Sequence, residues 1–429
     1  MDSLKRCLLF VLVLLFLIQL MRAVNGNLVF KVRHKYGGRS KNKAAALGSL
    51  VEHDSRRHGG MLAAIDFPLG GNGSPTGAAL YTTVTIGTPQ VDYHVQVDTG
   101  SDILWVNCQN CERCPTKSDL NQYDLSASST DCKAGTNCEY LIAYGDGSRT
   151  EGYFVRDQFR LDKVTGNLHT STMNGSIVFG CSAKQSGDLG SSSEAVDGLI
   201  GFGQANSSIV SQLALSGKVK KIFSHCLQGN KGGGIFAIGE VVEPKVNKTP
   251  LVPNAQHYNV NLMAVEVRGQ FLNLPTEILD SGSSRGTVID SGTTLAYLPS
   301  VVYQQLMDKI MAQQPNMQTH IVEQQFRCLR YHGNIDDGFP VVKFHFEGSL
   351  MLPVFPRDYL FKISDIVLSD KLVLYDLENQ TVGWAQYNWV HRASKLETKR
   401  LETLMMSAPM TYLLLSACVR LILYLSFCV

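Results

Sequence analysis

Val95-Gln-Val-Asp98-Thr-Gly-Ser101 is a short phrase that this chain uses twice. The second copy is Thr287-Val-Ile-Asp290-Ser-Gly-Thr293, and the two acids are 192 residues apart (290 − 98). Each copy is an apolar stretch that ends in Asp and continues with a hydroxyl residue, Gly and a second hydroxyl residue. A duplication with one acid per copy predicts two related lobes, with both acids where the lobes meet.

The sequence around the two copies has the pattern of a β protein. Between about residues 80 and 390 it consists mostly of short alternating or apolar runs, separated by Gly, Asn and Pro. Such runs predict strands joined by tight turns, and examples are Tyr81–Ile86, His94–Val97, Tyr258–Met263 and Val341–Phe346. A helix is expected over Val301–Met311, after the start signal Pro299-Ser300.

Length and composition exclude several classes of protein. A chain of 429 residues exceeds what one hydrophobic core usually serves. Lys and Arg total 39 against 37 Asp and Glu, so the net charge of +2 argues against a nucleic-acid binder. With 44% hydrophobic and 18% charged residues, the chain is not mainly disordered.

Two carboxylates a few ångströms apart cannot both ionise readily, so such a pair shares one proton. The pair can take a proton from water while it gives one to a carbonyl oxygen, which hydrolyses a peptide bond without a covalent intermediate. Ser101 and Thr293 are placed to donate hydrogen bonds to the acids, and Gly100 and Gly292 allow the loops to approach closely. Glycosidases also use two acids, at a wider separation.

A second Asp-Ser-Gly lies close to the second copy, at Asp280. Its preceding residues, Pro275–Leu279, are less strand-like, and Ser-Ser-Arg follows it instead of Thr-Thr-Leu. We therefore interpret Asp280 as a solvated turn residue and assign the chemistry to Asp290.

Four motifs in one order resemble the pepsin-like aspartic proteases, in particular the plant, nepenthesin-like branch with its GPI-anchored group. The motifs are Val97–Val106, Tyr144–Ser148, Asp197–Gly203 and Ile289–Leu295, and the resemblance covers roughly residues 80 to 390. It implies a mostly β, bilobal pepsin-like fold, with the active-site cleft between two related β lobes. It further implies a monomeric endopeptidase that acts on polypeptides at acid pH, with no cofactor and no metal.

The resemblance also assigns roles to individual residues. Asp98 and Asp290 would be the catalytic dyad, and Tyr144 and Gly145 would lie on a hairpin flap over the substrate. Trp105 would pack below the flap and hydrogen-bond to Tyr144. Taken alone, Tyr beside Gly-Asp-Gly is an ordinary hairpin turn, and Trp after a strand is an ordinary core residue.

A rival interpretation is a protease-like binding or inhibitor protein that keeps the cleft and does not cleave. Relatives of that kind typically carry an altered catalytic motif. Both Asp-Thr-Gly and Asp-Ser-Gly are intact here, which favours the enzyme.

The cysteines indicate a secreted, oxidised protein. Of 11 Cys, Cys7 lies in the N-terminal apolar segment, and Cys418 and Cys428 lie in the C-terminal one. The remaining eight form an even set that predicts disulfides with undetermined pairing. Seven of them are disulfide candidates: Cys108, Cys111, Cys114, Cys132, Cys138, Cys181 and Cys226. Cys328 has no cysteine partner in its own half of the chain. The spacing of Cys108, Cys111 and Cys114 also suits zinc or an iron–sulfur cluster.

The N-terminal segments carry targeting and processing signals. Residues 1–25, with the apolar run Leu8–Leu20, form a secretory signal peptide, for which a short membrane anchor is the alternative. Residues 26–77 are basic and end in a Gly-rich linker, which suits a prosegment whose cations neutralise the dyad, or else a solvated tail. The lobes are expected at residues 78–250 and 251–392.

The C-terminal segments indicate attachment to a membrane. A stem at residues 393–409 precedes the apolar tail 410–429, and small residues near Ser407 suit a GPI attachment site on the outer face of the cell membrane. A nearly absent polar spacer and Arg420 fit this poorly, so a transmembrane helix or a buried helix stays open.

Glycosylation is expected at sequons that a secreted chain exposes. The candidates are Asn174, Asn206, Asn247 and Asn379, with Asn72 doubtful because Pro75 follows its Ser74.

One stretch departs from the family pattern. Behind the Asp290 loop the family places two apolar residues followed by Gly-Asp, whereas this chain has Lys362-Ile-Ser-Asp365. Ser364 stands at the Gly position, and compared with the family pattern the stretch is shortened near residues 361–364. We expect the second lobe to be weakened there.

Overall fold

The computed structural model describes residues 27–34, 63–64, 80–115, 120–127, 138–144, 147–164, 170–187, 189, 197–227, 234–239, 245–279, 286–293, 296–322, 326–360 and 367–387. The chain divides into one unit at Met1–Ala385 and another at Gln386–Val429. All that follows concerns the first unit, and the fold is mostly β, as predicted.

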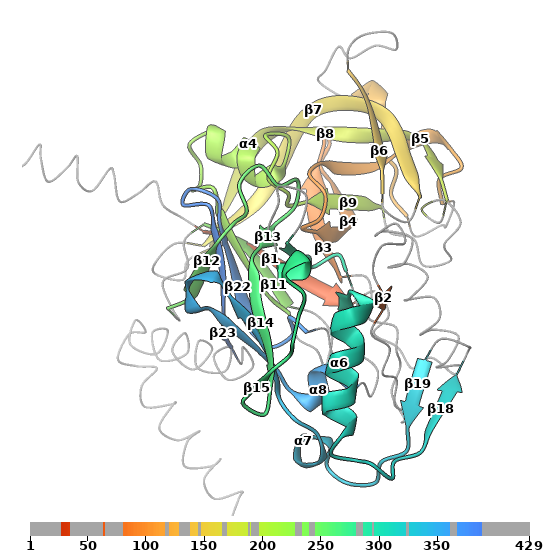
Figure 1. Cartoon of the computed structure of the whole chain (residues 1–429). Coiled ribbons are helices and arrows are strands. Elements are labelled where there is room, and N and C mark those ends of the chain that lie inside the picture. The colour runs from red at the N-terminus through yellow and green to blue at the C-terminus, as the bar shows by residue number, and fades with distance from the viewer. Residues whose placement is uncertain are drawn as a thin grey trace, which may run out of the picture. The chain divides into compact units, whose positions relative to one another are not determined.

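The largest sheet has 13 strands. In spatial order they are β12 (Asn247–Pro250), β23 (Thr381–Gln386), β22 (Lys371–Asp376), β10 (Ile222–Leu227), β11 (Gly234–Ile238), β1 (Asn27–His34), β3 (Leu80–Ile86), β4 (Val91–Asp98), β9 (Gly198–Gly201), β5 (Leu104–Glu112), β8 (Thr170–Ser186), β7 (Arg149–Val164) and β6 (Glu139–Ala143). The long antiparallel pair β7 and β8 is prominent in Figure 1.

Alternation in the sequence explains how β4 sits in this sheet. Val95 and Val97 are fully buried, while the intervening Gln96 is half-buried. β4 pairs antiparallel with β3 and parallel with β9, so that Asp98 lies opposite Gly201. The first acid therefore ends a strand that is held on both sides.

The second half of the unit contributes β12, β22 and β23 to the large sheet and also contains smaller sheets. A four-stranded sheet has the order β15 (Gln270–Phe271), β14 (Leu262–Val267), β20 (Val342–Phe346) and β21 (Met351–Val354). Three strand pairs accompany it: β13 (Asn259–Val260) with β16 (Thr287–Val288), β17 (Tyr297–Leu298) with β2 (Ala63–Ala64), and β18 (Thr319–Val322) with β19 (Phe326–Leu329). The second acid follows β16, a much shorter strand than β4.

Short helices connect the sheets. They are α4 (Ile209–Leu215), α5 (Thr276–Leu279), α6 (Ser300–Met311), α7 (Ile335–Gly338) and α8 (Pro356–Tyr359), with 3-10 turns η1 (Leu125–Ala127) and η2 (Glu347–Ser349). α6 follows Pro299, as predicted, and buries Val302, Leu306 and Ile310 on one face. Among the helices described, none is both long and apolar enough to cross a membrane. The tail at residues 410–429 lies outside the described residues.

An aromatic cluster joins the large sheet to the second half of the chain. Phe223 on β10 stacks on Tyr375 of β22, with ring centroids 4.4 Å apart. Tyr258, just before β13, meets Tyr375 edge-on at 4.6 Å. All three side chains are fully buried. Such packing holds the elements behind both acids as one body.

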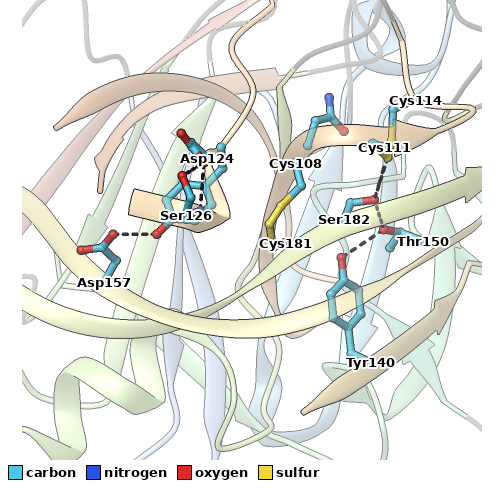
Figure 2. Close-up of a disulfide and its surroundings, with 12 residues drawn as sticks. Cys108, Cys111, Cys114, Asp124, Ser126, Tyr140, Thr150, Asp157, Cys181 and Ser182 are labelled. Atoms are coloured by element: carbon cyan, nitrogen blue, oxygen red, sulfur yellow. Dashed lines mark hydrogen bonds between the residues drawn. A yellow bond between two sulfur atoms is a disulfide. The ribbon is translucent and has the colours of Figure 1, made fainter. Parts of the chain in front are cut away.

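Two disulfides join described cysteines, Cys108–Cys181 and Cys111–Cys114 (Figure 2). Cys138 is also disulfide-bonded, and Cys132 lies outside the described residues. Cys328 is a buried free thiol, as its position in the sequence suggested.

The disulfide expected for Cys226 is wrong. Cys226 is a buried thiol in the middle of the large sheet, and its neighbours on the adjacent strands are Ile235 and Leu372. Burial, reinforced by Asp370, raises the pKa of this thiol to about 12. The even count of cysteines therefore did not translate into a complete set of bridges.

Candidate active site

The loop after β4 holds the carboxylate of Asp98 with two hydrogen bonds from its own residues. The Gly100 N–H donates to Asp98 Oδ1 at 2.9 Å, and the Ser101 hydroxyl donates to Oδ2 at 2.6 Å. Asp98 itself is fully buried. The second hydroxyl of the repeated phrase thus has the role that the sequence predicted.

The loop after β16 repeats this arrangement around Asp290. The Gly292 N–H donates to Asp290 Oδ1 at 2.8 Å, and the Thr293 hydroxyl donates to Oδ2 at 2.6 Å. Asp290 is 8% exposed. The duplicated sequence thus forms the same arrangement twice, a Gly N–H bonded to Oδ1 and a hydroxyl bonded to Oδ2, which we call a carboxylate cradle.

The two loops contact each other directly. The Thr99 hydroxyl donates to Asp290 Oδ1 at 3.1 Å and accepts the Ser291 N–H at 2.8 Å. A Cβ added to Gly100 would lie 2.9 Å from Asp290 Oδ2, so only Gly permits this approach. The structure therefore brings together the acids that are 192 residues apart in the sequence (290 − 98).

Thr99 is a site residue that sequence reasoning missed. The first hydroxyl of the phrase was treated as part of a pattern, whereas in the structure it is the contact between the loops. The signal was present, because both copies carry a hydroxyl residue at this position, Thr99 and Ser291. The two differ, since the Ser291 hydroxyl oxygen is buried with no hydrogen-bond partner among the described residues.

Strand β9 supports the Asp98 loop from behind. A Cβ on Gly198 would overlap the backbone of Trp105, and one on Gly201 would overlap that of Asp102. Asp197, just before β9, accepts the His94 N–H at 2.6 Å and the Asn121 N–H at 2.7 Å. Burial outweighs these bonds and raises the pKa of Asp197. The motif Asp197–Gly203 is thus the structural backing of the first loop.

The predicted flap is a hairpin between β6 and β7. Tyr144 N–H donates to the Ser148 carbonyl at 2.9 Å, which closes the turn. The indole N–H of Trp105 donates to the Tyr144 hydroxyl at 2.7 Å, the contact that the family resemblance implied. Ile103, Trp105, Tyr140 and Leu199 form an apolar cluster on which Tyr144 packs. Gly145 lies outside the described residues.

A buried polar chain connects the flap to a disulfide (Figure 2). The Tyr140 hydroxyl is 3.2 Å from that of Thr150, which donates to the Ser182 hydroxyl at 2.9 Å. Ser182 Oγ lies 3.8 Å from Cys111 Sγ. Hydroxyl partners of this kind allow Tyr140 to be buried at the base of the flap.

An apolar cavity of about 270 Å³ lies beside Asp290. Asp290 and Thr293 border it on the polar side. The rest of the wall is mostly apolar and comes from the second half of the chain, including Ile289, Leu298, Val302, Phe344, Phe346 and Leu368. A cavity of this size and lining suits an apolar side chain next to the acids.

The remaining predicted positions are partly described. Asn174, Asn206, Asn247 and Asn379 are all exposed. The Asn379 side-chain N–H also donates to Asp376 Oδ2 at 2.9 Å, so glycosylation there competes with a hydrogen bond. Asp280, Ser364 and Ser407 lie outside the described residues. No group of three or more His, Cys, Asp or Glu suited to a metal ion occurs among those described.

Comparisons with known proteins agree with this geometry. The family model Xylanase inhibitor N-terminal matches residues 80–240, and Xylanase inhibitor C-terminal matches residues 257–368. Aspartic proteinase 39 of Arabidopsis thaliana is 46% identical over 412 residues, which cover 85% of each chain. Aspartic proteinase 36 of the same plant is 46% identical over 415 residues, 86% of this chain and 85% of the relative.

A more distant relative points the same way. Aspartic proteinase nepenthesin-2 of Nepenthes gracilis is 31% identical over 246 residues, 51% of this chain and 52% of its own. The two family models match consecutive segments of the chain, with one acid in each, as the bilobal interpretation requires.

Proposed function

This chain belongs to the plant branch of the pepsin-like aspartic proteases, and we propose that Asp98 and Asp290 are its catalytic dyad. The observation that carries the proposal is the pair of mirrored carboxylate cradles, joined through Thr99. An aspartic-type endopeptidase needs two carboxyl groups that share one proton, and this arrangement supplies them.

The chemistry follows from one ionised and one protonated carboxyl. The ionised group takes a proton from water, whose oxygen attacks the peptide carbonyl carbon. The protonated group gives its proton to the carbonyl oxygen, so a neutral tetrahedral diol forms. When the C–N bond breaks, the nitrogen takes a proton from the dyad, one diol hydroxyl returns one, and the acid and amine products leave.

We propose that the substrate is an extended polypeptide with apolar side chains near the scissile bond. Two apolar surfaces support this: the cluster around Trp105 under the flap, and the cavity next to Asp290. Peptide libraries with a charged or an apolar residue at each position would test it, and equal cleavage of both would contradict it.

Acid pH is the second part of the proposal. Raising the pH removes the proton that the pair must share, so activity should fall towards neutrality. Digestion of a denatured protein from pH 3 to pH 8, with and without pepstatin, is the direct test. A flat profile, or activity that pepstatin leaves unchanged, would contradict a carboxyl dyad.

We also propose that residues 26–77 act as a prosegment that covers the cleft until it is removed. Support comes from β2 (Ala63–Ala64), which pairs with β17 (Tyr297–Leu298). Tyr297 and Leu298 both line the cavity next to Asp290. Cleavage between residues 64 and 80 on acidification should therefore accompany the appearance of activity, and full activity of the uncut chain would contradict this.

Secretion and a lipid anchor near Ser407 are proposed from the sequence of the two ends. Phosphatidylinositol-specific phospholipase should release the protein from cells, and truncation before Met410 should make it freely secreted. If the protein stays on the membrane after phospholipase treatment with its tail intact, a transmembrane helix replaces the lipid anchor.

The second candidate is a binding protein that keeps the cleft, and the name of the matching family models is what favours it. Intact Asp-Thr-Gly and Asp-Ser-Gly loops and relatives named proteinases favour turnover. Titrating active sites with pepstatin and measuring turnover per site separates the two. Stoichiometric pepstatin binding with no turnover would establish the binding protein.

A further inference from the structure

Strand β1 (Asn27–His34) lies in the middle of the large sheet, although it comes from the proposed prosegment. Five register pairs, over Leu28–Val32, join it to β11. Three pairs, over Val32–His34, join it to β3 on its other side, and Asn27 and Leu28 also pair with β7. β1 is therefore an internal strand of the sheet and not an edge strand.

Among the pairings that the structure describes, β1 is the only connection between two groups of strands. One group consists of β12, β23, β22, β10 and β11, and the other of β3, β4, β9, β5, β8, β7 and β6. The additional pairings are β1 with β7 and β3 with β7, and neither joins the two groups in the absence of β1. Loss of β1 would thus divide the 13-stranded sheet into one sheet of five strands and one of seven.

The strand edges that β1 covers belong to the hydrophobic core. Opposite β1, Phe236 and Ile238 of β11 are fully buried, and Thr82 of β3 is 2% exposed. If β1 left, backbone N–H and C=O groups of both neighbouring strands would lose their partners at a buried position. Such groups are costly to leave unpaired, so the sheet strongly favours a strand in this place.

The sequence in front of β3 is a poor substitute for β1. Cleavage between residues 64 and 80 leaves at most residues 65–79 attached to β3. That segment contains Pro68, Pro75 and four Gly, whereas Asn27–His34 contains neither residue type. Because Pro lacks the N–H that a ladder needs and Gly weakens a strand, the new N-terminal segment is not suited to an internal position.

The ladder between β1 and β11 also supports the loop of Asp98. Phe236, opposite Phe30 in the ladder, packs on Phe202 with the ring centroids 5.0 Å apart. The Phe202 N–H donates to the Asp98 carbonyl at 2.8 Å. Loss of β1 would therefore expose the edge of the strand whose Phe236 ring packs on the residue bonded to Asp98.

We propose that residues 27–34 stay bound after the prosegment is cut, so that the mature protein consists of two chains held together by β1. The proposal rests on the proposed cleavage between residues 64 and 80, and it limits what that cleavage releases. The part that leaves is the part around β2, which pairs with β17 through two residues only, beside the cavity next to Asp290. The two parts of the prosegment therefore have different fates.

The test uses the full-length protein with two engineered sites for a sequence-specific protease. One site replaces residues 37–40 and the other replaces residues 70–73, and both lie outside the described residues. Cutting gives a peptide that carries β1, a middle fragment that carries β2, and the remaining body. Gel filtration at pH 4 and at pH 7, followed by mass spectrometry of the body peak, shows which pieces remain bound.

We expect about one β1 peptide per body at both pH values, and loss of the middle fragment at pH 4. Loss of the β1 peptide at either pH, whether or not the body stays folded, would overturn the proposal. Retention of the middle fragment beside the β1 peptide would instead contradict the prosegment of the proposed function. Mass spectrometry needs no turnover, so an inactive dyad would leave this measurement unaffected.

A proline variant tests whether the strand itself holds the peptide. In Val29→Pro combined with Phe30→Pro, one N–H directed at β11 is lost, because neighbouring residues of a strand direct their N–H groups to opposite sides. The variant peptide should dissociate on the order of 10-fold faster than the wild-type peptide. Tyr36→Pro, beyond the end of the strand, is the matched control and should dissociate at the wild-type rate. Equal rates in the two variants would overturn the proposal.

If the proline variant does not fold, a second measurement replaces it. The β1 peptide is washed from the cut wild-type body in urea, the urea is diluted, and a synthetic peptide of residues 27–34 is added. This peptide should restore the Tm, and a peptide with the same residues in scrambled order should not. An equal effect of both peptides, or none of either, would refute the inference.

Discussion

The loops that carry Asp98 and Asp290 make the same hydrogen bonds to their carboxylates, but the strands that support the two loops differ. In both, a Gly N–H reaches Oδ1 and a hydroxyl reaches Oδ2, at distances that agree within 0.1 Å. Behind Asp98 stands β4, paired on both sides and backed by the glycines of β9. Behind Asp290 stands β16, two residues long and paired with β13. The repeated local sequence gives both carboxylates the same hydrogen bonds, whereas the strand pairing behind the two loops differs between the two halves of the unit.

The largest effect should come from either acid, because the loops work only as a pair. Asp98→Asn and Asp290→Asn should each reduce hydrolysis on the order of 10⁴-fold, since one shared proton needs both carboxyls. Secretion and Tm should change little. Turnover per pepstatin site is the measurement, and Asp280→Asn is the control that should be nearly silent. Substantial cleavage by either single variant would show that one acid suffices and would contradict the dyad.

The next largest effect should show the unequal support. Gly201→Ala would force a Cβ into the Asp102 backbone and should destabilise the protein by about 3 kcal/mol. Ser364→Gly restores the glycine that the family pattern has at this position, which lies outside the described residues, and should stabilise the protein by about 1 kcal/mol. Urea unfolding of both variants measures this. A loss of stability in Ser364→Gly would mean that the second lobe closes by another route.

A smaller effect concerns the edge of the large sheet, where Lys248 of β12 contacts Asp376 of β22 at 2.5 Å. Burial would raise the pKa of Asp376, but hydrogen bonds from Lys248 and Asn379 outweigh it and hold this pKa below its usual value. Stability from a lowered carboxyl pKa is present at neutral pH and lost as the pH falls through the folded-state pKa.

Lys248→Gln should therefore cost about 1 kcal/mol at pH 7 and much less at pH 2. Thermal unfolding across this range measures it. Lys343→Gln, which removes a partner of Glu266 on the four-stranded sheet, offers the same comparison in the second half. An equal loss at both pH values would show that Lys248 acts through packing.

The smallest effect is expected for Cys328, the buried free thiol of β19. Cys328→Ser should leave the disulfides unchanged and cost no more than about 1 kcal/mol. In the wild type, alkylation of Cys328 should be slow in the folded protein and complete after unfolding, as peptide mapping would show. If Cys328 cannot be alkylated after unfolding, it is bonded to another cysteine.

The comparison also shows how far the sequence could be read. The repeated phrase located both acids, their hydroxyl donors and the glycines, because these contacts are made within three residues of each Asp. The Trp105–Tyr144 contact came from the family resemblance. The prediction of a disulfide for Cys226 was wrong because disulfide pairing depends on which strands become neighbours, and a count of cysteines carries no such information.

The sequence by itself determined the class of fold, the family and the two carboxylate cradles. Strand alternation and short-range hydrogen bonds depend only on residues that are close in the sequence, so they can be predicted without knowing which distant residues become neighbours. Only the tertiary structure decided that Thr99 joins the two loops, through its hydrogen bonds with Asp290 and Ser291. Those contacts depend on how the strands are arranged in space, which brings two loops that are distant in the sequence to one carboxylate.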